Sequence, residues 1–362
     1  MTATQTGHLS LDDYRNFVGR RTLVNKIYAR IGAGRPQSVS IVGDSRIGKS
    51  ALLRFLAHEE TRRQYLADPE EYIYLYISCR ELNPVTLENF TRILFKLSEP
   101  YAKVTEETDH SIFNYNYYKH LVESLHRDDK KIILFLDDFN LITLNPAFPL
   151  EFFSFLRSLA NNYNMAYVTT SYEDLQKLCV SKDIEESPFF NIFTNMSLKG
   201  FDDAELDQFL TQICPADRSG DTAYKNYLTG LAGRFPFPLL RTCELFQHMS
   251  DDRTQLEQRL YEELQEHFQI VWDRLETAHR DILKGIVAGD RLPDAQQYLL
   301  RDLNKKNYII LDDNSGAAID GRLFRNFIAR RAGVSVSDRQ TEKPGHGLKY
   351  WLKKLLGRHT AA

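Results

Sequence analysis

The sequence lacks the features that mark secreted, membrane-spanning or zinc-binding proteins. Its four cysteines are scattered along the chain, without the paired spacing of a zinc site. The N-terminal residues lack the basic and apolar regions of a signal peptide, and no apolar run approaches the ~18–20 residues of a membrane span. Together these absences predict a reduced, cytoplasmic protein.

The chain also has little excess charge, because 46 Lys and Arg stand against 49 Asp and Glu, a net charge of −3. Proteins that bind nucleic acid usually carry a basic face, so the overall charge disfavours that class. There is no internal repeat of about 20–50 residues, which excludes a solenoid or a propeller. What remains is a chain of 362 residues with 43% apolar content, enough for two or three globular domains.

The most specific motif is a glycine-rich loop with the pattern G-x-x-x-x-G-K-[ST], formed by Gly43, Asp44, Ser45, Arg46, Ile47, Gly48, Lys49 and Ser50. An apolar run, Ser38–Val42, precedes the loop, and a helix-forming stretch from Ala51 to His58 follows it. In such a loop the backbone N–H groups and the helix dipole bind phosphates, the lysine reaches the outer phosphates, and the hydroxyl binds Mg²⁺. We therefore predict an ATP or ADP site over residues 43–51, with Ser50 as a metal ligand.

A pair of aspartates forms the second half of the predicted site. Five apolar residues, Ile132–Leu136, predict a buried strand, and Asp137 and Asp138 follow at its carboxyl end, 88 residues after Lys49 (137 minus 49). Ligands bind at this end of the strands in open α/β sheets. We expect Asp137 to hold Mg²⁺ through water and Asp138 to orient or deprotonate the attacking water. Alone, the same run would also fit a strand that enters a turn, so the prediction depends on the glycine-rich loop.

The pattern along the chain predicts an α/β core followed by a helical region. Residues 17–200 alternate β-rich and helical stretches, which is typical of a parallel sheet. Residues 201–334 are mostly helical, but a helical stretch from Tyr298 leads into a hairpin that turns at Asn-Ser-Gly, as at the end of a winged helix. The five strands are expected at Ser38–Val42, Tyr72–Ser78, Ile132–Leu136, Ala166–Thr170 and Phe193–Leu198.

Two weaker segments add candidate residues. Thr170 and Ser171 end the fourth predicted strand and would sense the terminal phosphate, although Ser and Thr also commonly lead a strand into a turn. Asp138, Lys49 and Thr170 are thus the catalytic candidates. The segment FVGRR has a glycine that would let the backbone fold against the adenine, although an ordinary helix start fits equally well. Its candidate nucleotide contacts are Phe17, Val18, Gly19 and Arg20.

These motifs resemble those of a known family. FVGRR, GDSRIGKSALLRFL, IILFLDD and VTTSYEDL occur in the order and spacing of the STAND ATPases, signal-transduction P-loop ATPases related to the AAA+ class. The sequence is similar to the bacterial and archaeal members over about residues 14–332. The resemblance implies an ASCE-type P-loop core at 17–200 with a five-stranded parallel sheet, a helical lid at 201–255 and a winged-helix domain at 256–333.

The resemblance extends to a lid motif and has two departures. AGRFPFPLLRTC resembles the G-G-x-P motif that closes over ADP, with Gly233 and Pro236 matching and Arg234 in place of the second glycine. A plain interhelical turn would show the same residues. Tyr172 stands where many members have an arginine after the fourth strand, and Gly19-Arg20-Arg21 replaces glycine-arginine-glutamate. These departures leave the rate of hydrolysis open but keep the binding residues.

The function implied by the resemblance is a switch that closes on ADP, opens and self-associates with ATP, and hydrolyses ATP slowly in signalling or defence. Family relatives usually add an effector domain and a long sensor array. Only 16 residues precede the predicted core here and about 30 follow the predicted winged helix. We therefore expect the effector or sensor to be a separate protein.

The ends of the chain carry their own predictions. Residues 1–16 are polar and are expected to be flexible, and residues 334–346 predict a polar linker. Residues 347–358, GLKYWLKKLLGR, predict a basic amphipathic helix, and residues 334–362 contain six Lys and Arg against two acids, a net of +4. Such a helix lies on an anionic membrane or docks in a partner groove, although packing back on its own domain fits as well.

Two alternative functions follow from these features. The first is a DNA-associated ATPase, similar to origin-recognition or transposition ATPases, which join an AAA+ core to a winged helix. Residues 251–331 contain 13 Lys and Arg against 15 Asp and Glu, a net of −2, which disfavours nucleic acid as a partner. The second is a membrane-tethered nucleotide-binding scaffold, held at the inner membrane face by the tail helix.

Overall fold

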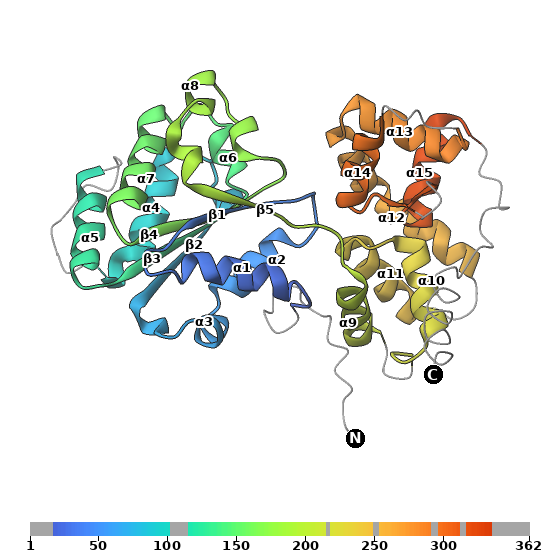
Figure 1. Cartoon of the computed structure of the whole chain (residues 1–362), viewed down its shortest axis with the longest axis horizontal. Helices are drawn as coiled ribbons and strands as arrows, with labels where there is room; N and C mark the ends of the chain where they lie inside the picture. Colours follow the sequence, from blue (N-terminus) through green and yellow to red (C-terminus); the bar gives the residue numbers. More distant parts are fainter. Residues whose placement is uncertain are drawn as a thin grey trace, which may run out of the picture.

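The structure is a computed structural model that describes residues 17–101, 115–214, 218–248, 253–290, 296–311 and 316–334. An α/β core (residues 17–200) lies beside a mostly helical C-terminal part (residues 201–334), and the chain passes between them after the fifth strand (Figure 1). The predicted N-terminal segment, the tail helix and nearly all of the predicted linker lie outside the described residues. No helix among the described residues is long and apolar enough to span a membrane.

The core contains one parallel five-stranded sheet in the order β2-β3-β4-β1-β5. The five predicted strands are confirmed, each within one residue at either end. This order puts the loop after β1 and the aspartates after β3 at the same carboxyl edge, with β4 between them. The strands are β1 (Ser38–Val42), β2 (Tyr72–Ser78), β3 (Lys131–Asp137), β4 (Met165–Ser171) and β5 (Phe193–Ser197).

Helices cover both faces of this sheet (Figure 1). Along β3, Ile133 and Phe135 pack against α1 and α2, whereas Ile132, Leu134 and Leu136 pack against α4, α5 and α7. Both sets are apolar, so the strand is a continuous apolar run, as expected of a parallel strand buried on both faces. The core helices are α1 (Arg21–Ile31), α2 (Lys49–Ala57), α3 (Glu59–Tyr65), α4 (Leu87–Ser98), α5 (Tyr115–Arg127), α6 (Asn140–Thr143), α7 (Leu150–Asn162) and α8 (Lys182–Glu185).

The C-terminal part contains seven helices and one hairpin among its described residues. Strands β6 (Ile309–Leu311) and β7 (Ala317–Ile319) pair antiparallel, which confirms the predicted hairpin. The predicted boundary between lid and winged helix, at residue 255, falls inside α12. The helices are α9 (Asp203–Ile213), α10 (Thr222–Ala232), α11 (Pro236–His248), α12 (Arg253–Arg274), α13 (Thr277–Ala288), α14 (Gln297–Lys305) and α15 (Arg322–Ala332).

The two parts share a hydrophobic cluster. It includes Ile41 of β1 and Leu53 of α2 together with Phe268 and Trp272 of α12 and Phe324 of α15. A second cluster fills the opposite face of the sheet, and a third joins α9, α10 and α11. The C-terminal part therefore packs on the core through apolar side chains as well as through polar contacts.

Candidate nucleotide-binding site

The glycine-rich loop connects β1 to α2, and its backbone geometry explains why two of its positions are glycine. A Cβ on Gly43 would lie 2.7 Å from the carbonyl oxygen of Leu198, so only glycine fits there. Gly48 has a φ of 100°, a left-handed conformation that favours glycine. The pattern of the motif thus follows from how the loop turns between the strand and the helix.

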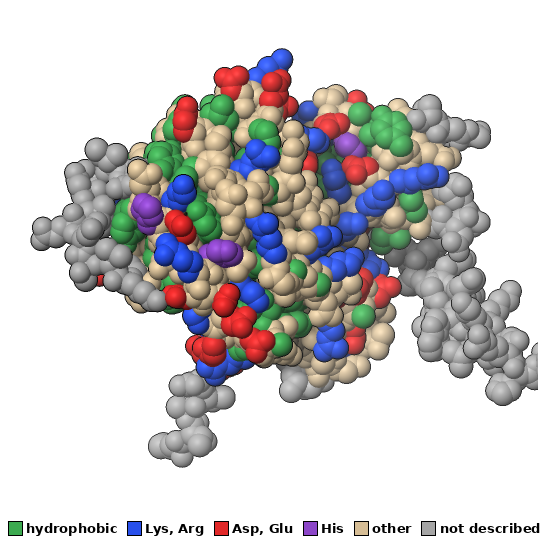
Figure 2. Space-filling view, turned by 60° about the vertical axis from the view of Figure 1, so that its left-hand side comes forward, with side chains coloured by type: hydrophobic (Ala, Val, Ile, Leu, Met, Phe, Trp, Pro, Cys, Tyr) green, Lys and Arg blue, Asp and Glu red, His purple; other side chains and the backbone are tan. Residues whose placement is uncertain are grey.

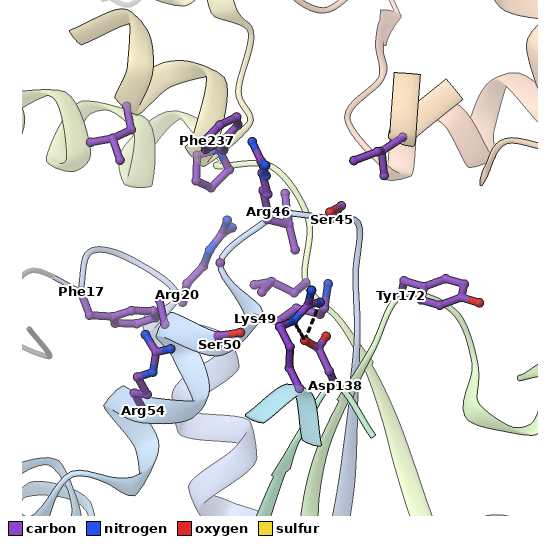
Figure 3. A pocket seen from close by; sticks show the side chains of 18 of the residues that line it. Phe17, Arg20, Ser45, Arg46, Lys49, Ser50, Arg54, Asp138, Tyr172 and Phe237 are labelled. Atoms are coloured by element: carbon purple, nitrogen blue, oxygen red, sulfur yellow. Dashed lines mark hydrogen bonds and ion pairs between the residues drawn. The ribbon is translucent and has the colours of Figure 1, made fainter. Parts of the chain in front are cut away.

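Lys49, the first residue of α2, folds back over this loop. Its Nζ donates hydrogen bonds to the carbonyl oxygens of Gly43 at 2.8 Å and Asp44 at 2.7 Å. Burial lowers the pKa of Lys49 to about 8, against the opposing charges of Asp138 and Asp44. The ammonium group therefore lies where the loop would hold phosphates, next to Asp138 (Figure 3).

The two aspartates at the end of β3 have different surroundings. Asp137 is buried, and its carboxylate accepts hydrogen bonds from the hydroxyls of Thr170 and, at 3.2 Å, Tyr76. Asp138 has a φ of 53° and lines the cavity described below. Its backbone N–H donates to Thr170 Oγ1 at 2.8 Å. Asp138 therefore faces the cavity, whereas Asp137 lies behind it.

Thr170, which was predicted to sense the terminal phosphate, lies at the end of β4. Its buried hydroxyl donates to the Asp137 carboxylate and accepts from the backbone N–H of Asp138. Ser171 is also buried, and its hydroxyl donates to the carbonyl oxygen of Glu173 at 2.6 Å. Neither residue lines the cavity. Thr170 contacts both aspartates, so it would influence chemistry in the cavity through them and not by touching a ligand there.

Arg80 pairs with Asp138, a contact that the sequence did not reveal. Arg80 lies in a short 3₁₀ turn, Cys79–Glu81, directly after β2. Its Nε and Nη2 lie 2.9 and 2.8 Å from Asp138 Oδ2. The strands β2 and β3 pair with Ser78 opposite Asp137, and this register brings the residues after β2 beside the aspartates. The contact could be predicted only after the strand order was known.

The segment before α1 is held by an acidic residue of α9. Gly19 and Arg20 have positive φ values of 74° and 58°. The backbone N–H of Arg20 donates to Glu205 Oε1 at 2.6 Å, and its Nη1 donates to Glu205 Oε2 at 3.0 Å. The Arg20 guanidinium also lies 4.4 Å from the centre of the Phe201 ring. Glu205 therefore fixes the predicted adenine-binding segment, a role that the sequence analysis missed.

A cavity of about 880 Å³ lies between the core and the C-terminal part. Such a volume is within the range of small-molecule sites in proteins. In Figure 3, Phe17 and Arg20 lie on one side of the glycine-rich loop, and Asp138 and Tyr172 lie on the other. Apolar side chains of the C-terminal part contribute to its lining, namely Phe201, Phe209, Pro236, Phe237, Leu240 and Ile270.

Most of the predicted site residues line this cavity, namely Phe17, Val18, Arg20, Ser45, Arg46, Ile47, Gly48, Lys49, Ser50, Ala51, Asp138 and Pro236. Gly43, Asp44, Gly19 and Asp137 adjoin these residues without lining the cavity themselves. Gly233 is not among the lining residues, and a Cβ there would lie 3.0 Å from the Asp320 carbonyl oxygen. The close approach of the β7–α15 connection is therefore sufficient to require glycine at this position.

The glycine-rich loop and the adjoining strand end also contact the C-terminal part directly. The Arg46 guanidinium lies 4.3 Å from the centre of the Phe237 ring, and the carboxylate of Asp44 accepts a hydrogen bond from the Tyr308 hydroxyl. Burial raises the pKa of Asp44, and this hydrogen bond opposes the rise. At the other side, Arg274 lies 4.4 Å from the ring centre of Tyr172.

Positive charge is concentrated around the cavity although the whole chain is slightly acidic. On the face shown in Figure 2, Lys and Arg side chains follow the border between the core and the C-terminal part. The cations in the lining are Arg20, Arg46, Lys49, Arg54, Arg80 and Arg274. Such a cavity suits an anionic ligand with an apolar portion.

The sheet order, the glycine-rich loop and the aspartate pair define a P-loop nucleoside-triphosphatase fold. Residues 33–284 match the model of the family described as Novel STAND NTPase 2, and the chain belongs to this family. A comparison with curated proteins gives no match.

Solved structures with a similar fold include an ATPase of Pyrococcus abyssi and the ORC2 protein of Aeropyrum pernix. A Walker-type ATPase of Pyrococcus abyssi is 17% identical, with a TM-score of 0.59, covering 88% of this chain and 99% of that one. The ORC2 protein of Aeropyrum pernix, in ADPNP–ADP complexes, is 13% identical, with a TM-score of 0.51, covering 90% and 98%. These likenesses agree with the predicted P-loop fold.

Proposed function

We propose that the protein is a switch that binds ATP and ADP with Mg²⁺ and hydrolyses ATP slowly. The observation that carries this proposal is that the glycine-rich loop and the helices α9, α11 and α12 line the same cavity. One nucleotide would therefore touch both parts of the chain. A ligand shifts a conformational equilibrium by the difference in its affinity for the two states, and contacts with both parts provide such a difference.

The residues of the site suit this chemistry. Lys49 and Ser50 would bind the phosphates and Mg²⁺, and Asp137 would hold the metal through water, because hydroxyl and carboxylate oxygens are the donors that Mg²⁺ prefers. Bound Mg²⁺ would neutralise charge on the transferred phosphoryl group. Asp138 would position the attacking water, and Thr170 would hold both aspartates. Phosphoryl transfer needs little beyond such positioning and charge stabilisation.

The proposed division of the C-terminal part follows its elements. Helices α9–α11 would form the lid, and α12–α15 with the β6–β7 hairpin would form a winged-helix domain. With ADP the C-terminal part would stay against the core, and with ATP it would open and expose a surface for self-association. Signalling or defence in the cytoplasm, with a separate effector or sensor protein, is the setting that we propose.

Nucleotide content and mass test the switch. The purified protein is denatured to release nucleotide, and its mass is measured by light scattering before and after addition of ATP and Mg²⁺. We expect a monomer that carries ADP and whose measured mass increases when ATP is added. The increase should be absent in Lys49→Ala and present in Lys26→Ala, which replaces an exposed lysine of α1. A purified protein that contains no nucleotide and whose mass does not change when ATP is added would contradict the proposal.

A DNA-associated ATPase is the second candidate, favoured by the helix α14 followed by a hairpin and disfavoured by the net charge of −2 over residues 251–331 (13 minus 15). Duplex binding that requires ATP and weakens steeply with salt would support it. A third candidate, a membrane-tethered scaffold, depends on residues 347–358, which lie outside the described residues. Flotation with anionic liposomes, with and without residues 347–362, tests that candidate separately.

A further inference from the structure

Arg80 is a cation of the cavity to which the proposed function assigns no role. It follows β2, and its side chain lines the cavity together with Lys49, Ser50 and Asp138. Because β2 pairs with β3 along its whole length, with Ser78 opposite Asp137, the sheet itself fixes Arg80 beside the aspartates. Its position is thus set by the core and does not depend on the C-terminal part.

The ion pair uses only one edge of the guanidinium group. Nε and Nη2 both contact Asp138 Oδ2, at 2.9 and 2.8 Å. The Nη1 N–H groups lie outside this ion pair. A guanidinium group has five N–H donors in a planar fork, so it can bind a carboxylate on one edge and a second anion on another. The Arg80 side chain is 76% exposed, compared with 19% for Asp138, so its free edge is accessible from the cavity.

A cation at this place would reduce the repulsion between Asp138 and the terminal phosphate of ATP, in addition to the charge that Lys49 and Mg²⁺ would neutralise. A water positioned by Asp138 must attack that phosphate, so the phosphate and the carboxylate have to lie close together. Two anions at short range repel each other unless a positive charge lies between them. The adjoining strand β4 and the residue after it present Thr170, Ser171 and Tyr172, which are uncharged. Lys49 would contribute its charge from the glycine-rich loop, whereas Arg80 is the lining cation that is bonded to the Asp138 carboxylate itself.

We propose that Arg80 binds the terminal phosphate of ATP through its Nη1 edge while its Nε and Nη2 hold Asp138. This inference rests on the proposed nucleotide site. It makes Arg80 the residue by which the site distinguishes ATP from ADP, because ADP has no phosphate at that position. Arg80 also positions Asp138 relative to the phosphate. The arrangement in which one arginine bridges the carboxylate and the terminal phosphate can form only when a triphosphate is bound.

Isothermal titration of the full chain with Mg²⁺ and either ADP or the β,γ-imido analogue of ATP tests this inference. The variants are Arg80→Ala, Arg80→Lys and the matched control Arg63→Ala, an arginine of α3 that is 59% exposed and paired with Glu59 at 2.6 Å. Loss of a charge-assisted contact should weaken binding of the analogue about tenfold or more in Arg80→Ala. ADP binding should stay within about twofold. Arg80→Lys should be intermediate, because lysine keeps the charge but not the fork.

Other results would overturn the inference. Equal weakening of ADP and the analogue in Arg80→Ala, or no weakening of either, would show that Arg80 does not read the terminal phosphate. If the wild-type protein binds both nucleotides and only the Arg80 result fails, the nucleotide site stands and this inference alone is wrong. Binding of neither nucleotide by the wild type would reject both. Should circular dichroism show that Arg80→Ala is unfolded, Arg80→Gln, which preserves more of the side chain, takes its place with the same expectations.

Discussion

Replacing Glu205 with alanine should remove the hydrogen bonds and the ion pair that hold the segment before α1 against the helix α9. Glu205 accepts hydrogen bonds from the backbone N–H of Arg20 at 2.6 Å, from Arg20 Nη1 at 3.0 Å and from the backbone N–H of Asp202 at 3.2 Å. Only 7% of Arg20 is exposed, so the alanine variant would leave a buried guanidinium group without its carboxylate. The same variant removes half of the capping box at the start of α9.

The expected decrease in the free energy of unfolding follows from the loss of the ion pair and the loss of the helix cap. Removing one partner of a buried ion pair costs about 3–5 kcal/mol, and loss of a helix cap costs about 1 kcal/mol. The Glu205 side chain is 18% exposed, which places the ion pair at the lower end, so we expect unfolding to become easier by about 3 kcal/mol. ADP affinity should fall as well, because Phe17, Val18 and Arg20 line the cavity.

Urea denaturation followed by circular dichroism measures the first effect, and titration with ADP measures the second. Glu262→Ala is the control, because Glu262 is an exposed helical glutamate that accepts a hydrogen bond from Gln258 at 2.7 Å. That variant should stay within about 0.5 kcal/mol of the wild type. A loss below about 1 kcal/mol in Glu205→Ala, with ADP affinity unchanged, would refute the argument that the ion pair holds this wall of the cavity.

Three further predictions follow from the site and its supports. Burial lowers the pKa of Lys49 to about 8, so above that pH the apparent Kd for ADP should rise about tenfold per pH unit as binding takes up a proton. Titration in buffers of different ionisation enthalpy would detect this uptake, and a flat profile to about pH 9 would contradict it. Burial raises the pKa of Asp320 to about 6, against a hydrogen bond from the Arg234 backbone. The folded state therefore retains this proton to a higher pH than the unfolded state does, and the free energy of unfolding should fall by about 2 kcal/mol as the pH rises from about 4 to about 6. Urea denaturation at both pH values should show less of this fall in Asp320→Asn. Gly233→Ala should destabilise the protein by about 1–3 kcal/mol in thermal or urea unfolding, because Gly233 has a φ of 76°. Gly230→Ala, with open space around its Cβ, should not destabilise it.

The architecture of the core could be predicted because its signals are local. Strands β1 to β4 are short runs rich in apolar and β-branched residues, and turn residues flank them, so their ends were predicted within one residue. The phosphate loop is equally local, since Gly43 and Gly48 are required by the turn itself. The hairpin at β6–β7 was marked by the Asn-Ser-Gly sequence between two apolar runs.

The contacts across the cavity could not be predicted because they depend on how distant elements meet. Arg80 reaches Asp138 only through the pairing of β2 with β3. Glu205 had a local signal, the capping box with Asp202, but nothing nearby in the sequence indicates its bond to Arg20. Thr170 was correctly placed at the end of β4, yet the direction of its hydroxyl depends on Asp137, which lies on another strand.

The hydrophobic cluster shared by the two parts has a thermodynamic consequence. Its members include Ile47 of the glycine-rich loop, Phe235 before α11 and Phe268 of α12. Swinging the C-terminal part away from the core would transfer some of these side chains to water, and exposure of apolar surface raises the heat capacity. Nucleotide binding that opens the molecule should therefore carry a positive change in heat capacity, whereas closure around the ligand should carry a negative one. The temperature dependence of the binding enthalpy would thus report the direction of the motion without any label.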